Sequence, residues 1–192
     1  MRRPSRGFTI VELLIVIVII AILAAIMTVM YAGLQQQAKN RAKVSAVGQA
    51  AKLIKLYKAA NDTYPRNTTG NWCLTQDNTC TGYSGTVTTT NNTLLIDNLK
   101  RYGVPPASGG DTVVSGGRYG IQYMYNTSFT LQGESNPLLL LFWLEGVNQT
   151  CSGLIGDMIS VTDSPPANNF APALRSSGNS GGKTRCYLMF PT

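Results

Sequence analysis

The residues that could do chemistry in this sequence are few, and the types that are missing exclude most kinds of catalytic site. The chain has no histidine, which excludes a serine–histidine triad, a histidine-ligated zinc ion and a histidine pH switch. Only 9 residues are Asp or Glu, and no nucleophile stands in a pattern with a general base. We therefore expect that the protein is not an enzyme and needs no cofactor.

One carboxylate lies where a charge is costly. Glu12 directly precedes a segment without charged residues, from Leu13 to Ala38, of which Leu13 to Met27 is apolar without interruption. Residues Leu13 to Leu34 would form about 33 Å of helix at roughly 1.5 Å per residue, enough to span a bilayer core of about 30 Å. An unpaired charge in hydrocarbon costs about 2.5–3.5 kcal/mol on insertion scales, so Glu12 is a candidate functional residue. The alternative is a solvated acid at a helix N-terminus, favoured there by the helix dipole.

The sequence before Glu12 carries a distinctive set of features. Residues 1–7 (MRRPSRG) hold three arginines and no acid, and the Gly7-Phe8 junction is followed by the acid Glu12 and then by the apolar segment. This combination resembles the prepilin signature of type IV pilins and pseudopilins. In that family a membrane peptidase cleaves after the glycine and the new N-terminus is methylated. The resemblance therefore implies cleavage between Gly7 and Phe8, N-methylation of Phe8, and pairing of Glu12 with the N-terminal amine of a neighbouring subunit during filament assembly.

Electrostatics supports the role that the resemblance gives to Glu12. Opposite charges attract strongly in a medium of low dielectric constant, whereas either charge alone is costly there. A subunit with an unpaired Glu12 would gain by packing against a neighbour that supplies an amine. Loss of residues 1–7 would also lower the net charge from +7 to +4, with 13 basic and 9 acidic side chains remaining.

Helix-forming sequence continues past the apolar segment, with no proline between Pro4 and Pro65. At about 100° per residue, one face gathers six apolar residues. They are Ala46, Val47, Ala50, Leu53, Ile54 and Tyr57. We expect one helix from Phe8 to about Ala60, half of it transmembrane, ended by Asn61-Asp62 and Tyr64-Pro65.

The rest of the chain is rich in Thr, Asn, Gly and Ser and predicts strands. The candidates are Gly120–Asn126, Ser128–Gly133, Pro137–Glu145 and Arg185–Phe190, the first two as a hairpin and the third as a central strand. The expected fold is α+β and pilin-like, a long N-terminal helix packed on a small antiparallel sheet. Its expected parts are the leader 1–7, the hydrophobic helix half 8–38 and a globular head 39–192.

Four cysteines lie beyond the apolar segment, Cys73, Cys80, Cys151 and Cys186. Four cysteines allow three pairings, and an exported head favours structural disulfides over an all-cysteine zinc site. We favour Cys73–Cys80 and Cys151–Cys186, the second of which resembles the disulfide-bounded region of many pilins.

Two weaker signals concern ligands. Asp157 and Asp163 flank a turn-prone stretch that resembles the calcium loop of major pseudopilins, although such sites usually gather more carboxylates, and a solvated loop is the favoured interpretation. A DNA-binding face is one interpretation of the basic residues Arg66, Lys100, Arg101 and Arg118 together with the tyrosines of the head. They cluster no more densely than a pair, so a solvated basic surface is favoured, and a DNA or surface ligand stays unproven.

The resulting hypothesis is a structural subunit of a type IV pilus (fimbrium) for adhesion, twitching motility or DNA uptake. Its expected partners are copies of itself, other pilins, the prepilin peptidase and the membrane. It would begin as a single-pass precursor in the cytoplasmic membrane and end in an extracellular pilus at the cell surface. A pseudopilin of a type II secretion or competence system is the first alternative, and a single-span membrane-anchored protein is the second.

Overall fold

The computed structural model describes residues 9–65, 70–76, 80–81, 87–88, 93–107, 119–125, 130–131, 134–135, 138–151, 155, 159–161 and 179–190. The chain divides into two compact units, residues 1–37 and residues 38–192. The helix α1 (Ile10–Asn61) contributes to both units. It agrees with the expected helix of about 8–60, although Phe8 itself lies outside the described residues.

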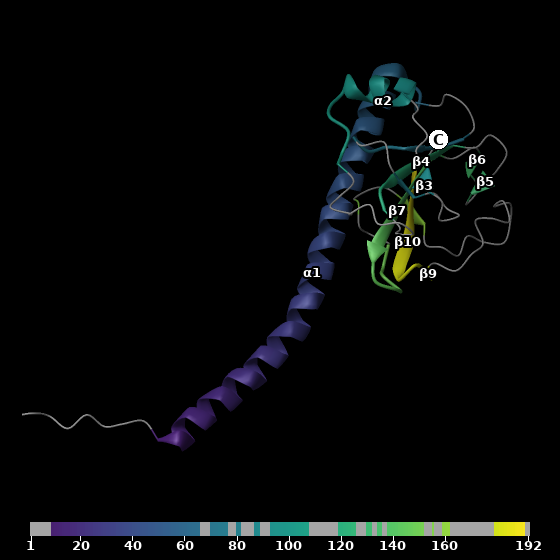
Figure 1. Ribbon diagram of the computed structural model, residues 1–192. Helices are drawn as coiled ribbons and strands as arrows, with labels where there is room; N and C mark the ends of the chain where they lie inside the picture. Colours follow the sequence, from purple (N-terminus) through teal and green to yellow (C-terminus); the bar gives the residue numbers. More distant parts are fainter. Residues whose placement is uncertain are drawn as a thin grey trace, which may run out of the picture. The chain divides into compact units, whose positions relative to one another are not determined.

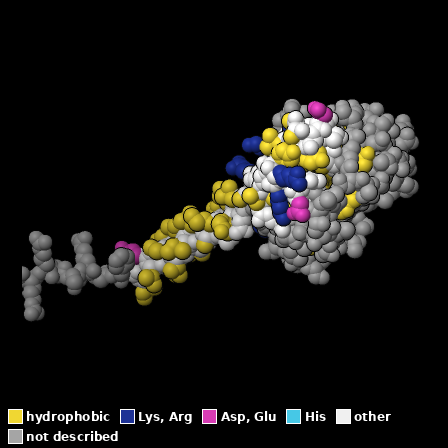
Figure 2. All heavy atoms as spheres, turned by 90° about the horizontal axis from the view of Figure 1, so that it is seen from above, with side chains coloured by type: hydrophobic (Ala, Val, Ile, Leu, Met, Phe, Trp, Pro, Cys, Tyr) yellow, Lys and Arg dark blue, Asp and Glu magenta, His cyan; other side chains and the backbone are white. Residues whose placement is uncertain are grey.

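The part of α1 within residues 1–37 exposes apolar side chains all round. Large apolar residues from Ile10 to Leu34 are exposed, and Figure 2 shows hydrophobic side chains along this part of the helix. By length and composition α1 could cross a membrane, because its most apolar window has a mean hydropathy of 3.3 and is 0% buried. A helix that is apolar on every side has no face suited to water.

The part of α1 within residues 38–192 has one buried face. All of the expected apolar residues lie on it, with Tyr57 partly buried and the other five buried. The helix ends at Asn61 because Asp62 takes a left-handed conformation with φ 55°, and Pro65 follows three residues later. The helix end predicted at Asn61-Asp62 is therefore confirmed.

The head contains a second helix, α2 (Thr93–Lys100), and several strands. The strands are β1 (Gly70–Cys73), β2 (Cys80–Thr81), β3 (Val87–Thr88), β4 (Ile121–Tyr125), β5 (Thr130–Leu131), β6 (Glu134–Ser135), β7 (Leu138–Glu145), β8 (Ile159–Val161), β9 (Asn179–Ser180) and β10 (Lys183–Phe190). The main sheet is antiparallel, with the order β1-β4-β7-β10-β8 and with β9 also paired to β10. Figure 1 shows β7 and β10 side by side in this sheet.

Strand β7 is central, as its uniformly apolar sequence predicts. It pairs with β4 on one side and with β10 on the other, where Leu138 lies opposite Phe190 and Glu145 opposite Lys183. One face of the sheet joins α1 and α2 in the main core. The opposite face holds a smaller buried cluster that includes Trp143 and Tyr187. On that face the guanidinium carbon of the buried Arg185 lies 5.7 Å from each of these two ring centroids.

Some expectations for the head were wrong. Strand β4 does not form a hairpin with the following strand, because β1 and β7 occupy its two edges and β5 pairs with β6 instead. Helix α2 was not expected, although Leu95, Ile96 and Leu99 are buried at helical spacing.

Candidate functional site

Glu12 lies in the first turn of α1 and is part of a reciprocal cap. Its Oε2 accepts hydrogen bonds from the backbone N and from the Oγ1 of Thr9, both at 2.8 Å. In return the backbone N of Glu12 donates to Thr9 Oγ1 at 3.3 Å. Thr9 and Glu12 thus form a capping box, in which two side chains satisfy backbone donors that a helix N-terminus leaves open.

The cap occupies one oxygen of the carboxylate. Both bonds from Thr9 end on Oε2, and within the described part of the chain no donor reaches Oε1 of Glu12. The carboxylate is exposed. It can therefore keep its cap and still accept a hydrogen bond or an ion pair from outside the chain.

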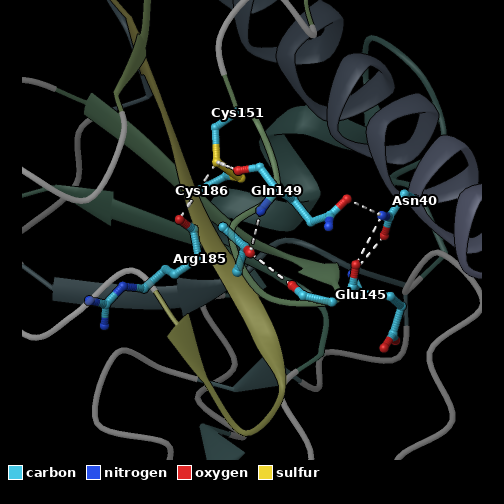
Figure 3. The surroundings of a disulfide bond; sticks show 8 residues. Asn40, Glu145, Gln149, Cys151, Arg185 and Cys186 are labelled. Carbon is cyan, nitrogen blue, oxygen red and sulfur yellow. Dashed lines mark hydrogen bonds between the residues drawn. A yellow bond between two sulfur atoms is a disulfide. The ribbon is translucent and has the colours of Figure 1, made fainter.

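The second arrangement of interest lies in the head, around the disulfide Cys151–Cys186 (Figure 3). The side-chain amide of Asn40 on α1 bonds to both backbone groups of Glu145 at the end of β7. Asn40 Nδ2 donates to the carbonyl oxygen of Glu145 at 3.1 Å, and the backbone N of Glu145 donates to Asn40 Oδ1 at 2.6 Å. Asn40 Nδ2 also donates to Gln149 Oε1 at 3.4 Å. Asn40 therefore joins α1 to the turn that leads from β7 to Cys151.

Strand β10 holds the same turn from its other side. The backbone N of Gln149 donates to Thr184 Oγ1 at 2.9 Å, and Thr184 Oγ1 donates to the carbonyl oxygen of Gly146 at 2.8 Å. Lys183 Nζ lies 2.7 Å from Glu145 Oε1, across the pair of strands. The turn is thus fixed to the helix, to β10 and, through Cys151, to the disulfide.

Both disulfides have the favoured pairing. Cys73 is bonded to Cys80, with a Cα–Cα distance of 5.4 Å, and Cys151 to Cys186, with a Cα–Cα distance of 5.6 Å. The first joins β1 to β2, and the second joins the segment after β7 to β10.

Comparison with known proteins identifies the N-terminal part of the chain. Residues 2–28 match the family described as the prokaryotic N-terminal methylation motif. The chain carries this motif. The methylation motif includes Glu12 and most of the apolar helix that follows it, so the resemblance inferred from the residues around Gly7, Phe8 and Glu12 is confirmed.

The chain is also similar to two curated proteins. The chain is similar to the type IV wide pilus major component PilA4 of Thermus thermophilus, with 37% identity over 65 residues, 34% of this chain and 50% of the relative. It is also similar to the type II secretion system core protein G of Dickeya chrysanthemi, with 33% identity over 70 residues, 36% of this chain and 46% of the relative. The chain spans about half the length of the curated relatives it matches. No solved structure matches it.

Other predicted site residues fall partly outside the described residues. Gly7 and Phe8, at the junction within the methylation motif, lie outside them, as do the calcium candidates Asp157 and Asp163. Among the residues that are described, no group of three or more His, Cys, Asp or Glu side chains could hold a metal ion. Lys100 forms an exposed ion pair with Asp97 at 3.3 Å.

Sequence reasoning missed the partners of two site residues. The capping box is visible in the sequence as Thr9 followed by Glu12 three residues later, and this spacing could have identified it. Asn40 gave no comparable signal, because its main partner, Glu145, is 105 residues away along the chain.

Proposed function

We propose that the protein is a structural subunit of a type IV pilus, which polymerises through the apolar part of α1. The observation that carries this proposal is an exposed apolar helix surface from Ile10 to Leu34, within a helix that begins at Ile10 and is capped by Thr9 and Glu12. Exposed side chains of this kind are stable only in a bilayer or against other apolar surfaces. Copies of the same helix offer such a surface.

The proposal includes processing of the precursor. A peptidase in the cytoplasmic membrane cleaves between Gly7 and Phe8, and the amine of Phe8 is methylated. In the filament the Phe8 amine of one copy pairs with Glu12 of its neighbour, whose Oε1 accepts no hydrogen bond from the described residues. In hydrocarbon, the attraction between the two opposite charges offsets part of their desolvation cost, so the pair is less costly than either charge left without a partner.

A pseudopilin of a type II secretion system is the second candidate, favoured by the similarity to the core protein G of such a system. The two functions share the cleavage and the helix, and they differ in where the product is found. A pilus subunit leaves the envelope in a long fibre, whereas a pseudopilin stays with the envelope. In neither function does the head act as an enzyme.

Intact mass spectrometry of protein sheared from cells tests the proposal. We expect a chain that begins at Phe8, is one methyl group heavier than the bare chain and is two hydrogens lighter for each disulfide. Abundance in the sheared fraction supports the pilus, and retention of the same species in the envelope supports the pseudopilin. A chain that still begins at Met1 would overturn both and leave a single-span membrane-anchored protein.

A further inference from the structure

The head has a pocket of about 400 Å³ beside α1, shortly after the apolar part of the helix. Its lining is mostly apolar and comes from both sides of the gap between α1 and the turn after β7. On α1 the lining includes Arg41, Val44 and Ser45, and across from them it includes Leu144, Gln149 and Thr150.

The walls of this pocket are fixed in place. Asn40, which also lines it, bonds to Glu145 and Gln149, and the turn is tied in addition to Thr184. The disulfide of Cys151 holds the end of the turn. A pocket whose walls are already ordered can bind a partner at little cost in conformational entropy.

The chemistry of the lining favours an aliphatic side chain as the occupant. The amide groups of Asn40 and Gln149 already make hydrogen bonds with the protein, and Val44 and Leu144 supply apolar surface. Burial of an aliphatic side chain in such a site is favourable because it removes apolar surface from water. The polar groups at the rim, such as Ser45 and Thr150, are exposed and need no partner from a ligand.

An aliphatic side chain of this kind projects from another part of the head. Val104 is 73% exposed, more than any other large apolar side chain described in residues 38–192. Its loop is held rigidly, since Gln76 Nε2 donates to the carbonyl oxygen of Pro105 at 2.8 Å and the backbone N of Gln76 donates to that of Pro106 at 3.0 Å. On its other side, the backbone of Gly103 is so near α1 that a Cβ there would lie 2.8 Å from Leu53 Cδ2.

We propose that Val104 of one copy of the chain occupies the pocket of a neighbouring copy. Gly103 contacts α1 at Leu53, whereas the pocket contacts α1 at Val44, which is about 14 Å nearer the N-terminus at 1.5 Å per residue. Pocket and valine are therefore at different places on the head. When two copies are joined by this contact, one copy still has a free valine and the other still has a free pocket. Each can bind a further copy, so the contact can repeat along a filament.

The occupant is a second copy because, under the proposed function, copies pack through α1, the helix that also supplies one wall of the pocket. Its α1 residues follow the exposed apolar part of the same helix, which packs against other copies under the proposed function. This inference rests on that function, and adds to it a specific contact between heads.

Disulfide trapping in filaments tests the contact. The variant Val104→Cys/Thr150→Cys places one cysteine on the projecting loop and one at the pocket, and the native cysteines in the described residues are all paired. After mild oxidation of sheared filaments, we expect a ladder of covalent trimers and longer oligomers on a non-reducing gel. Each single variant should give dimers at most. The pair Leu56→Cys/Thr150→Cys, with a less exposed apolar position at 40%, is the matched control and should give no ladder.

A second set of variants keeps the test decisive if the cysteines disturb folding. Ser45→Phe fills the pocket, whereas Gln49→Phe places the same side chain one turn further along the exposed face of α1. We expect Ser45→Phe to lower filament yield roughly tenfold, which corresponds to about 1.4 kcal/mol, and Gln49→Phe to leave it unchanged. Both variants should keep the unfolding temperature of the unaltered chain.

The outcomes separate this contact from the proposed function. Filaments without a ladder, or with equal yields from Ser45→Phe and Gln49→Phe, would overturn the contact and leave the pilus intact. Full reaction of the cysteine at position 150 with a maleimide in filaments would show an open pocket and would also overturn it. If the unaltered chain forms no filaments, the proposed function fails first.

Discussion

Glu12 combines a cap and a charge, and two substitutions separate them. Glu12→Gln keeps an oxygen that can accept the bonds from Thr9 but removes the negative charge, while Glu12→Ala removes both. If pairing with a neighbour's amine drives assembly, both variants should be cleaved normally and yield few filaments, because the amine would be left without a partner. Immunoblots of the sheared and the membrane fractions measure the two steps.

Thr9→Ala is the matched control for Glu12. It removes the hydroxyl of the cap and keeps the charge, so we expect helix stability to fall by about 1 kcal/mol with filament yield largely kept. Normal filaments from Glu12→Gln, together with poor filaments from Thr9→Ala, would contradict the charge role and leave Glu12 as a capping residue.

Asn40 is expected to matter for the stability of the head. Asn40→Ala leaves the backbone N and the carbonyl oxygen of Glu145 without the partners that they have on α1. A partly buried backbone group that loses its hydrogen bond costs about 1–3 kcal/mol. We expect a loss of this size in the free energy of unfolding, measured with urea on the detergent-solubilised chain. Gln49→Ala, on the exposed face of the same helix, should change it little, and equal effects would contradict the role of Asn40.

For single residues, the sequence could predict contacts between neighbours in the chain but not contacts between residues far apart in it. Glu12 was evident because a carboxylate beside a long apolar run is unusual by itself, and its cap follows from a spacing of three residues. The contacts of Asn40 and Thr184 depend on where β7 and β10 come to lie. No local pattern contains that information.

Among the elements, the two disulfides should differ in their effect on stability. Their cysteines are 35 and 7 residues apart, and a crosslink constrains the unfolded chain more when it closes a longer loop. The loop-entropy relation gives about 4 kcal/mol for Cys151–Cys186 and about 2 kcal/mol for Cys73–Cys80. Alanine substitution of each pair, followed by urea unfolding, measures both. A larger loss from the shorter loop would contradict this order and indicate that local structure outweighs chain entropy.

The elements that could be predicted are those with a strong periodic or continuous pattern. Helix α1 and strand β7 follow from long apolar or amphipathic runs, and β4 from alternation. The partner of β4 could not be predicted, because short strands leave register and neighbours to tertiary packing. Helix α2 has only 8 residues, too few to be stable alone, and it is stabilised by burying Leu95 and Leu99 in the core.

For the whole molecule, the division of α1 between two units fits the proposed function, in which one chain lies first in a membrane and then in a filament. Every residue of the two core clusters lies beyond Ala38, so the head does not need the apolar part of the helix for its core. The apolar part has no buried face of its own. Under the proposed function, lipid covers its surface before assembly and other copies cover it afterwards.

This division predicts that residues 38–192 fold alone. We expect this fragment to be soluble and monomeric, and to unfold at nearly the same temperature as the detergent-solubilised chain, because it keeps the core, both disulfides and the Asn40 contacts. A fragment of residues 45–192 is the matched comparison. It loses Asn40 and the buried Lys43, and should be less stable by at least the roughly 1–3 kcal/mol expected for Asn40→Ala. Size-exclusion chromatography and thermal unfolding measure both properties. Aggregation of the fragment 38–192 would contradict independent folding of the head. Equal stability of the two fragments would contradict the contribution expected from Asn40 and Lys43.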